Sequence, residues 1–186
     1  NSIINITSIG DTLSMGINSY GIKEYGYIDY YKDYLTKENE NVNIINDYSK
    51  KDLSIMNLLE QVKNDSKIKK ELSESSTVIL TVGYNDLLYK LSLQETISEK
   101  ILHQIITEIS KDYKNLITEI RKYYKREIIV IGYYASNKND YYLNKGIRKL
   151  NQVLSNSNEV DYIDTYNLLS NRNLYFSHPN TNYPNR

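Results

Sequence analysis

The chain has 186 residues, with 23 basic side chains, 23 acidic side chains and no cysteine. A chain of this length can form one domain that buries roughly 70% of its unfolded surface, and its zero net charge gives no general attraction to nucleic acid or to an anionic membrane. The lack of cysteine excludes disulfides, thiol catalysis and thiolate-bound metal, and no apolar run approaches the roughly 20 residues that span a bilayer.

Five short apolar runs have the composition of β-strands. The run at 77–82 is the clearest, because it is continuous, short and rich in β-branched residues, as a buried parallel strand should be. Together the five runs predict strands at 3–9, 42–45, 77–82, 127–132 and 160–164.

Between these strands, apolar residues recur at helical spacing. The second of the helical segments carries Ile55, Leu58, Leu59 and Val62 on one face, and either Asp52 or Ser54 could cap its start. Besides this helix, the sequence predicts helices at 23–37, 93–125 and 142–154.

Alternation of strands and helices, with no linker and no internal repeat, predicts a single three-layer α/β/α domain over 1–186. Right-handed crossovers favour a five-stranded parallel sheet in the flavodoxin-like order 2-1-3-4-5. The switch point of such a sheet lies between strands one and three. The polar motifs Gly10-Asp11-Thr12 and Gly83-Tyr84-Asn85-Asp86 follow these two strands. Either motif alone could merely end a strand and satisfy loop backbone; their joint placement predicts one site.

At these residues the chain resembles the SGNH, or GDSL-type, hydrolase family. Residues 8–16 are similar to its first block, in which Gly-Asp-Ser-Leu carries the nucleophilic serine, and residues 81–86 are similar to its third block, Gly-x-Asn-Asp. The resemblance covers nearly the whole chain. It implies the SGNH-hydrolase fold, hydrolysis of esters of lipids, acylated sugars or similar small molecules, and no cofactor. It also implies that Asn85, in the loop that Gly83 opens, donates to the oxyanion.

The chain departs from the family pattern in its first two blocks. Thr12 stands at the nucleophile position, where its extra methyl stiffens χ1 and crowds a pocket shaped for serine. Ser14 is a hydroxyl on the wrong turn to replace it. In the second block, Asp52 falls at the position of a glycine whose backbone N–H joins the oxyanion hole. Its N–H could still donate, but its carboxylate would oppose a developing negative charge.

The last block, Asp-x-x-His-Pro in the family, fits this chain in two registers. One keeps His178 as the base and puts Tyr175 at the position of the aspartate. The other puts Tyr183 at the histidine position and Asn180 at that of the aspartate, and it matches over a longer run. Neutral tyrosine, with a pKa of about 10, is a poor general base near pH 7. With only two histidines in the chain, a His-based metal site is not expected.

Two functional hypotheses follow. In the first, the chain is a GDSL-type esterase or acylhydrolase that uses Thr12 as nucleophile, His178 as base, and Asn85 with the Thr12 N–H as oxyanion donors. In the second, it is a non-catalytic pseudoenzyme whose cleft binds a small ester or carbohydrate-type ligand, or a protein partner. A nucleotide-binding function is disfavoured, because neither loop has the required glycine pattern.

The ends of the sequence add two expectations. The chain opens on Asn1 without a methionine, as a processed chain does, so we expect a secreted or surface-anchored protein, with a cytoplasmic location left open. The last block of the family normally leads into a final helix, whereas this sequence stops at Arg186. We therefore expect either that the helix is absent or that the sequence was cut before it.

Overall fold

The computed structural model describes residues 3–10, 33, 41–47, 52–133, 140–157 and 159–163. Strands and helices alternate along this part of the chain, as the sequence predicts. In chain order they are β1 (Ile3–Gly10), β2 (Asn41–Asp47), α2 (Ile55–Asn64), α3 (Ser66–Glu74), β3 (Thr77–Thr81), α4 (Tyr84–Ser92), α5 (Glu99–Tyr123), β4 (Glu127–Ile131), α6 (Tyr141–Ser155) and β5 (Asp161–Ile163).

The strands form one five-stranded sheet in the order β2-β1-β3-β4-β5, and every neighbouring pair is parallel. The predicted flavodoxin-like order is therefore confirmed. The β1–β3 register pairs Gly10 with Thr81, so these two strands end at the same level of the sheet. Loops that leave them begin side by side.

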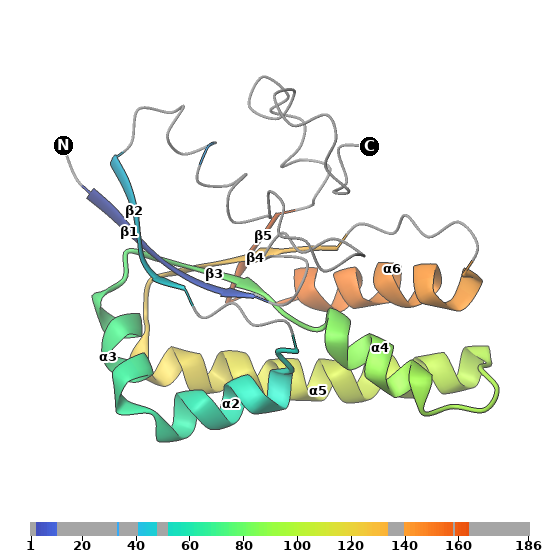
Figure 1. Cartoon of the computed structure of the whole chain (residues 1–186). Helices are drawn as coiled ribbons and strands as arrows, with labels where there is room; N and C mark the ends of the chain where they lie inside the picture. Colours follow the sequence, from blue (N-terminus) through green and yellow to red (C-terminus); the bar gives the residue numbers. More distant parts are fainter. Residues whose placement is uncertain are drawn as a thin grey trace.

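Helices α2 to α6 all lie on one side of the sheet (Figure 1). This follows from the strand order, because the chain crosses in one direction from β2 to β3, β4 and β5, and right-handed connections then fall on one face. The long helix α5 packs against α2, α3, α4 and α6. Each helix contributes buried apolar residues to the same core as the sheet, whose strand β3 is buried along its whole length. The fully enclosed side chains at the centre of this core include Leu58, Leu72, Val78, Leu80, Leu102, Ile109, Leu116, Ile120, Val130 and Leu150.

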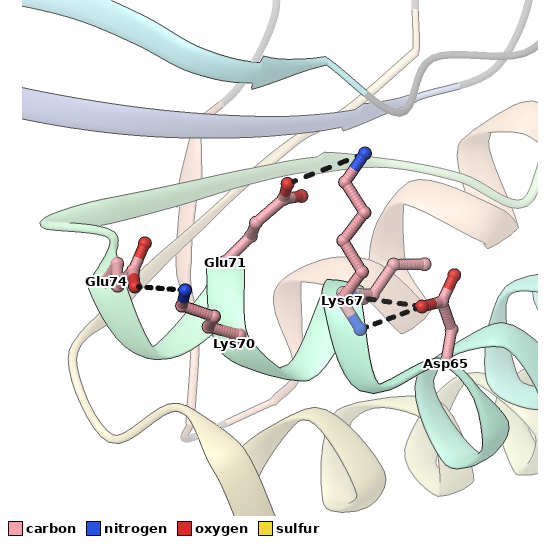
Figure 2. A network of polar contacts seen from close by, with 6 residues as sticks. Asp65, Lys67, Lys70, Glu71 and Glu74 are labelled. Carbon is pink, nitrogen blue, oxygen red and sulfur yellow. Dashed lines mark hydrogen bonds and ion pairs between the residues drawn. The ribbon is translucent and has the colours of Figure 1, made fainter.

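Two helices were not predicted from the sequence. Helix α3 buries only Ile68 and Leu72, and the rest of it is polar or charged. Its start is fixed by Asp65, whose carboxylate accepts the N–H groups of Lys67 and Ile68, and two lysine–glutamate pairs follow along it (Figure 2). Helix α4 is similarly short and begins within the third block, directly after Gly83. Two or three apolar positions are too few to give a readable helical period.

The start of the long helix was predicted too early in the sequence. A helix was expected over 93–125, but α5 begins at Glu99, because the hydroxyl of Ser98 accepts the N–H of Ile101 and so caps it there. Of the two predicted caps of α2, Asp52 and Ser54, the structure has Ser54, since its hydroxyl accepts the N–H of Asn57. The predicted helix at 23–37 lies outside the described residues, apart from Asp33.

Tyr124 joins the amino ends of β3 and β4. Its hydroxyl lies 3.0 Å from the carbonyl oxygen of Ser76 and 2.7 Å from that of Glu127, and its side chain is almost fully buried. Burial raises the pKa of this phenol to about 12. The hydroxyl therefore stays a donor throughout the physiological range.

Tyr124→Phe should lower the free energy of unfolding by about 1–3 kcal/mol, because two partly buried carbonyls lose the O–H donor that they share. Urea unfolding followed by circular dichroism measures this loss. Tyr123→Phe is the matched control, since the adjacent ring keeps its contact with the Lys69 ammonium, which lies 4.9 Å from the ring centroid. Equal losses in the two variants would contradict the role given to the Tyr124 hydroxyl.

Candidate active site

The site begins where β3 turns into α4. Gly83 lies between them as the residue before the helix, with φ +123°. A Cβ at this position would lie 3.2 Å from Leu150 Cδ1, so both the backbone angle and the available space favour glycine. The turn is so tight that Tyr84, Asn85 and Asp86 form the first turn of α4. They lie just beyond the level at which β1 ends.

Asn85 connects this turn to the segment before α2. Its side-chain Nδ2 donates to the backbone carbonyl of Leu53 at 3.2 Å. Leu53 is buried, and the preceding residue, Asp52, is exposed. The structure thus brings Asn85 next to the chain segment that carries Asp52, although these residues are 33 positions apart in the numbering and on different elements.

Asp86 makes a second connection to the same segment. Its carboxylate accepts the N–H of Ile55, the first residue of α2, with Oδ1 and Oδ2 at 3.3 and 3.2 Å from the nitrogen. The residue is only 8% exposed. Burial raises the pKa of this carboxyl from 3.8 to about 6, against the lowering effects of the Ile55 N–H, its own N–H and Lys90, while Asp112 adds to the increase.

An aromatic pair lies beside these residues. The rings of Tyr84 and Tyr133 are 5.5 Å apart between centroids and tilted by 32°. Tyr133 follows β4, and its backbone N–H and carbonyl both bond to the side-chain amide of Asn151 at 2.8 Å. The carboxyl edge of the sheet therefore carries an aromatic pair, in which Tyr133 is buried and Tyr84 directly precedes Asn85 in α4. The tyrosine-rich composition gave no means of selecting these two rings from the sequence.

Of the site residues predicted from sequence, Gly83, Asn85 and Asp52 are described and lie on connected segments. Asp11, Thr12, His178 and Tyr183 lie outside the described residues; Gly10, just before Asp11 and Thr12, ends β1. Asp86 belongs to the motif that was predicted to line the site, but no role was predicted for it. The only signal for it is that it is the last residue of the Gly-x-Asn-Asp motif, because its partner Ile55 belongs to another element.

Two further findings bear on what the site can use. Within the described ranges, no cluster of three or more histidine, aspartate or glutamate side chains could hold a metal ion. None of the helices in that same part of the chain combines the length and apolarity needed to cross a membrane.

A parallel sheet in this order, with a polar turn after β3, defines an α/β protein of flavodoxin-like topology. The model of the GDSL-like Lipase/Acylhydrolase family matches residues 6–181. The chain belongs to this family.

Solved structures of the same fold are distant in sequence. The lipase Lip_vut3 from a goat rumen metagenome is 23% identical, with a TM-score of 0.70 over 87% of this chain and 80% of the lipase. AlinE4, an SGNH-hydrolase family esterase, is 18% identical, with a TM-score of 0.59 over 88% of this chain and 76% of that protein. A catalytic mutant of Axe2, an acetylxylan esterase from Geobacillus stearothermophilus, is 15% identical, with a TM-score of 0.57 over 91% and 73% of the two chains. No curated protein matches this chain.

The raised pKa of Asp86 predicts a pH dependence of stability. Below about pH 4 the carboxyl is protonated in both the folded and the unfolded chain, and as the pH rises the unfolded chain loses its proton first. The contribution of Asp86 to the free energy of unfolding should therefore fall between about pH 4 and pH 6, by up to about 3 kcal/mol.

Asp86→Asn, which does not titrate, is the comparison, because all other groups contribute equally to both proteins. Urea unfolding at several pH values should show the wild type losing stability relative to Asp86→Asn as the pH rises from about 4 to 7. Parallel stability curves for the two proteins would contradict the assignment.

Proposed function

We propose that the chain is an acyl-ester hydrolase of the GDSL family, acting on lipid or acylated-sugar esters, with Thr12 as its nucleophile and a low turnover. The observation that carries the proposal is the register of Gly10 with Thr81, together with the bond from Asn85 to Leu53. The first links the starts of the loops after β1 and β3; the second joins the loop after β3 to the segment before α2. These are the segments that carry the first, third and second blocks of the family.

The reaction follows from the chemistry of these groups. The Thr12 hydroxyl attacks the ester carbonyl carbon while a base accepts its proton, and the carbonyl oxygen becomes an oxyanion. The Asn85 amide and the backbone N–H groups of Thr12 and Asp52 donate to that oxyanion. The alcohol leaves with the proton from the base, and water then hydrolyses the acyl-threonine. His178 is the candidate base.

Three substitutions account for the low turnover. The methyl group of Thr12 restricts its hydroxyl to fewer rotamers than serine has. The carboxylate of Asp52, which is exposed, lies on the segment that Asn85 contacts and disfavours negative charge nearby. The orienting aspartate of the last block is replaced by Tyr175 or by Asn180, depending on the register. A base that is not held in the right tautomer and orientation loses most of its effect.

A second candidate function is a pseudoenzyme that binds a small ester or carbohydrate-type ligand, or a protein partner, without turnover. The longer match of the last block favours it, because that register puts Tyr183 at the position of the base. In this case the fold and the oxyanion donors persist while the proton acceptor is lost. The two candidates differ in whether Thr12 reacts.

Hydrolysis of a panel of short-chain aryl esters tests the proposal. The wild type should turn over slowly, Thr12→Ala should abolish this activity, and Thr12→Ser should increase it, because serine fits the pocket without the extra methyl. Circular dichroism on each variant controls for folding. Residual catalysis over water of roughly 10³–10⁴-fold is possible even without a complete triad, so the loss in Thr12→Ala carries more weight than the absolute rate.

The result that would overturn hydrolysis is an inactive wild type whose activity is not restored by Thr12→Ser combined with Tyr183→His. That outcome would favour the pseudoenzyme. Direct binding of an acylated sugar to the unchanged wild type, followed by calorimetry, would then be the next measurement.

A further inference from the structure

We propose that Asp86 is a positioning residue, which holds the backbone of Asp52 to Ile55 in place against Asn85 and so sets the spacing of the oxyanion donors. The catalytic part of this inference rests on the proposed hydrolase function. The structural part, that Asp86 holds this segment, can be tested separately. We call the two connections from Asn85 to Leu53 and from Ile55 to Asp86 the 85–86 clamp.

The clamp joins α4 to the start of α2 through two consecutive residues of α4, Asn85 and Asp86. Asn85 Nδ2 donates to Leu53 O at 3.2 Å, and two residues further along the Ile55 N–H donates to the Asp86 carboxylate at 3.3 and 3.2 Å. One residue of α4 thus acts as a donor and the next as an acceptor for the same short stretch of backbone. A donor and an acceptor fixed to two points of one segment restrict both its position and its direction. The backbone N–H of Asp52 immediately precedes these points.

The clamp is itself anchored to the sheet. Asn85 and Asp86 lie in the first turn of α4, which begins at the positive-φ Gly83 two residues after the last residue of β3. That strand pairs with β1 up to Gly10. Asp86 therefore fixes the position of the segment before α2 relative to β1 and β3. Thr12 follows β1 in the sequence.

Ordinary helix capping does not explain the Asp86 contact. Helix α2 already has a local cap, because Ser54 Oγ accepts the N–H of Asn57 at 3.1 Å. Asp86 comes from 31 residues away and is 8% exposed. Burying a carboxylate opposes folding, but the N–H that it accepts belongs to Ile55, which is fully buried and which the local cap at Ser54 does not serve.

Asp65 provides the contrast within the same protein. It caps α3 from the adjacent position, accepting the N–H groups of Lys67 at 2.9 Å and Ile68 at 3.4 Å, and its contact with Lys67 is exposed (Figure 2). Asp65 thus caps its helix while it is exposed to solvent, and its partners are residues that follow it directly in the chain. Asp65 is therefore the matched control for Asp86.

Loss of the clamp should affect the transition state more than substrate binding. Oxyanion donors act on charge that develops only during the reaction, so their displacement lowers kcat and leaves KM nearly unchanged. A shift of about 1 Å in a positioned group can reduce the rate about 100-fold. A variant that only lowered global stability would not change kcat per folded molecule.

The experiment compares Asp86→Ala, Asp86→Asn and Asp65→Ala, each in the wild-type and in the Thr12→Ser background. Steady-state hydrolysis of a short-chain aryl ester gives kcat and KM, and hydrogen–deuterium exchange gives the protection of the backbone amides at 52–57. Both are measured at a temperature at which every variant is folded by circular dichroism.

Asp86→Ala should lower kcat by about 10- to 100-fold with little change in KM, and exchange at the Ile55 amide should become about 10-fold faster. Asp86→Asn keeps an acceptor oxygen and should stay close to the unsubstituted protein in both measurements. Asp65→Ala should accelerate exchange only at the start of α3 and leave kcat unchanged.

Three results would overturn the inference. Exchange at Ile55 could be no faster in Asp86→Ala than in Asp65→Ala; kcat could be unchanged although exchange accelerates; or Asp86→Asn could be as impaired as Asp86→Ala. If neither background hydrolyses any ester, the proposed function fails instead. The exchange data then still decide whether Asp86 holds the segment.

Discussion

The parallel pairing of β1 with β3 is the constraint on which the site depends. Because Gly10 lies opposite Thr81, the two strands end at one level of the sheet, and strand ends that are distant in sequence become neighbours. Burial of β3 along its length leaves no room for a shift of register, since a slip by one residue would exchange its two faces. Gly83 then allows α4 to begin almost at once, so the site groups stay close to the rigid sheet.

A buried carboxylate is the less favourable part of this arrangement. Asp86 lies near the first turns of α2 and α4, where unpaired N–H groups stabilise an anion, yet burial still raises its pKa to about 6. The protein therefore keeps a group that opposes folding near neutral pH in order to connect two helices beside Asn85. This pattern is common at functional sites, where local stability is lower than the fold alone would permit.

Much of the fold is readable from the sequence because it depends on local patterns. The β-branched run at 77–82 and the apolar stripe of Ile105, Ile109, Leu116 and Ile120 predict a buried strand and an amphipathic helix, and crossover handedness then selects the sheet order. Helix α3 was missed because only Ile68 and Leu72 mark it. The part played by Asp86 was missed for a different reason, since its partner at Ile55 is set by tertiary structure and leaves no local signal. Motif resemblance identified Asn85, and the positions of Thr12, His178 and Tyr183 lie outside the described residues.

The central claim is that a GDSL-type site in this chain reacts through a threonine. Covalent labelling with an alkyl fluorophosphonate tests it most directly, because the reagent phosphonylates an activated hydroxyl beside an oxyanion hole without needing turnover. Peptide mapping by mass spectrometry should find the adduct at position 12. Labelling should be slow in the wild type, faster in Thr12→Ser and absent in Thr12→Ala. No adduct in the wild type or in Thr12→Ser, or an adduct on Ser14, would contradict the account.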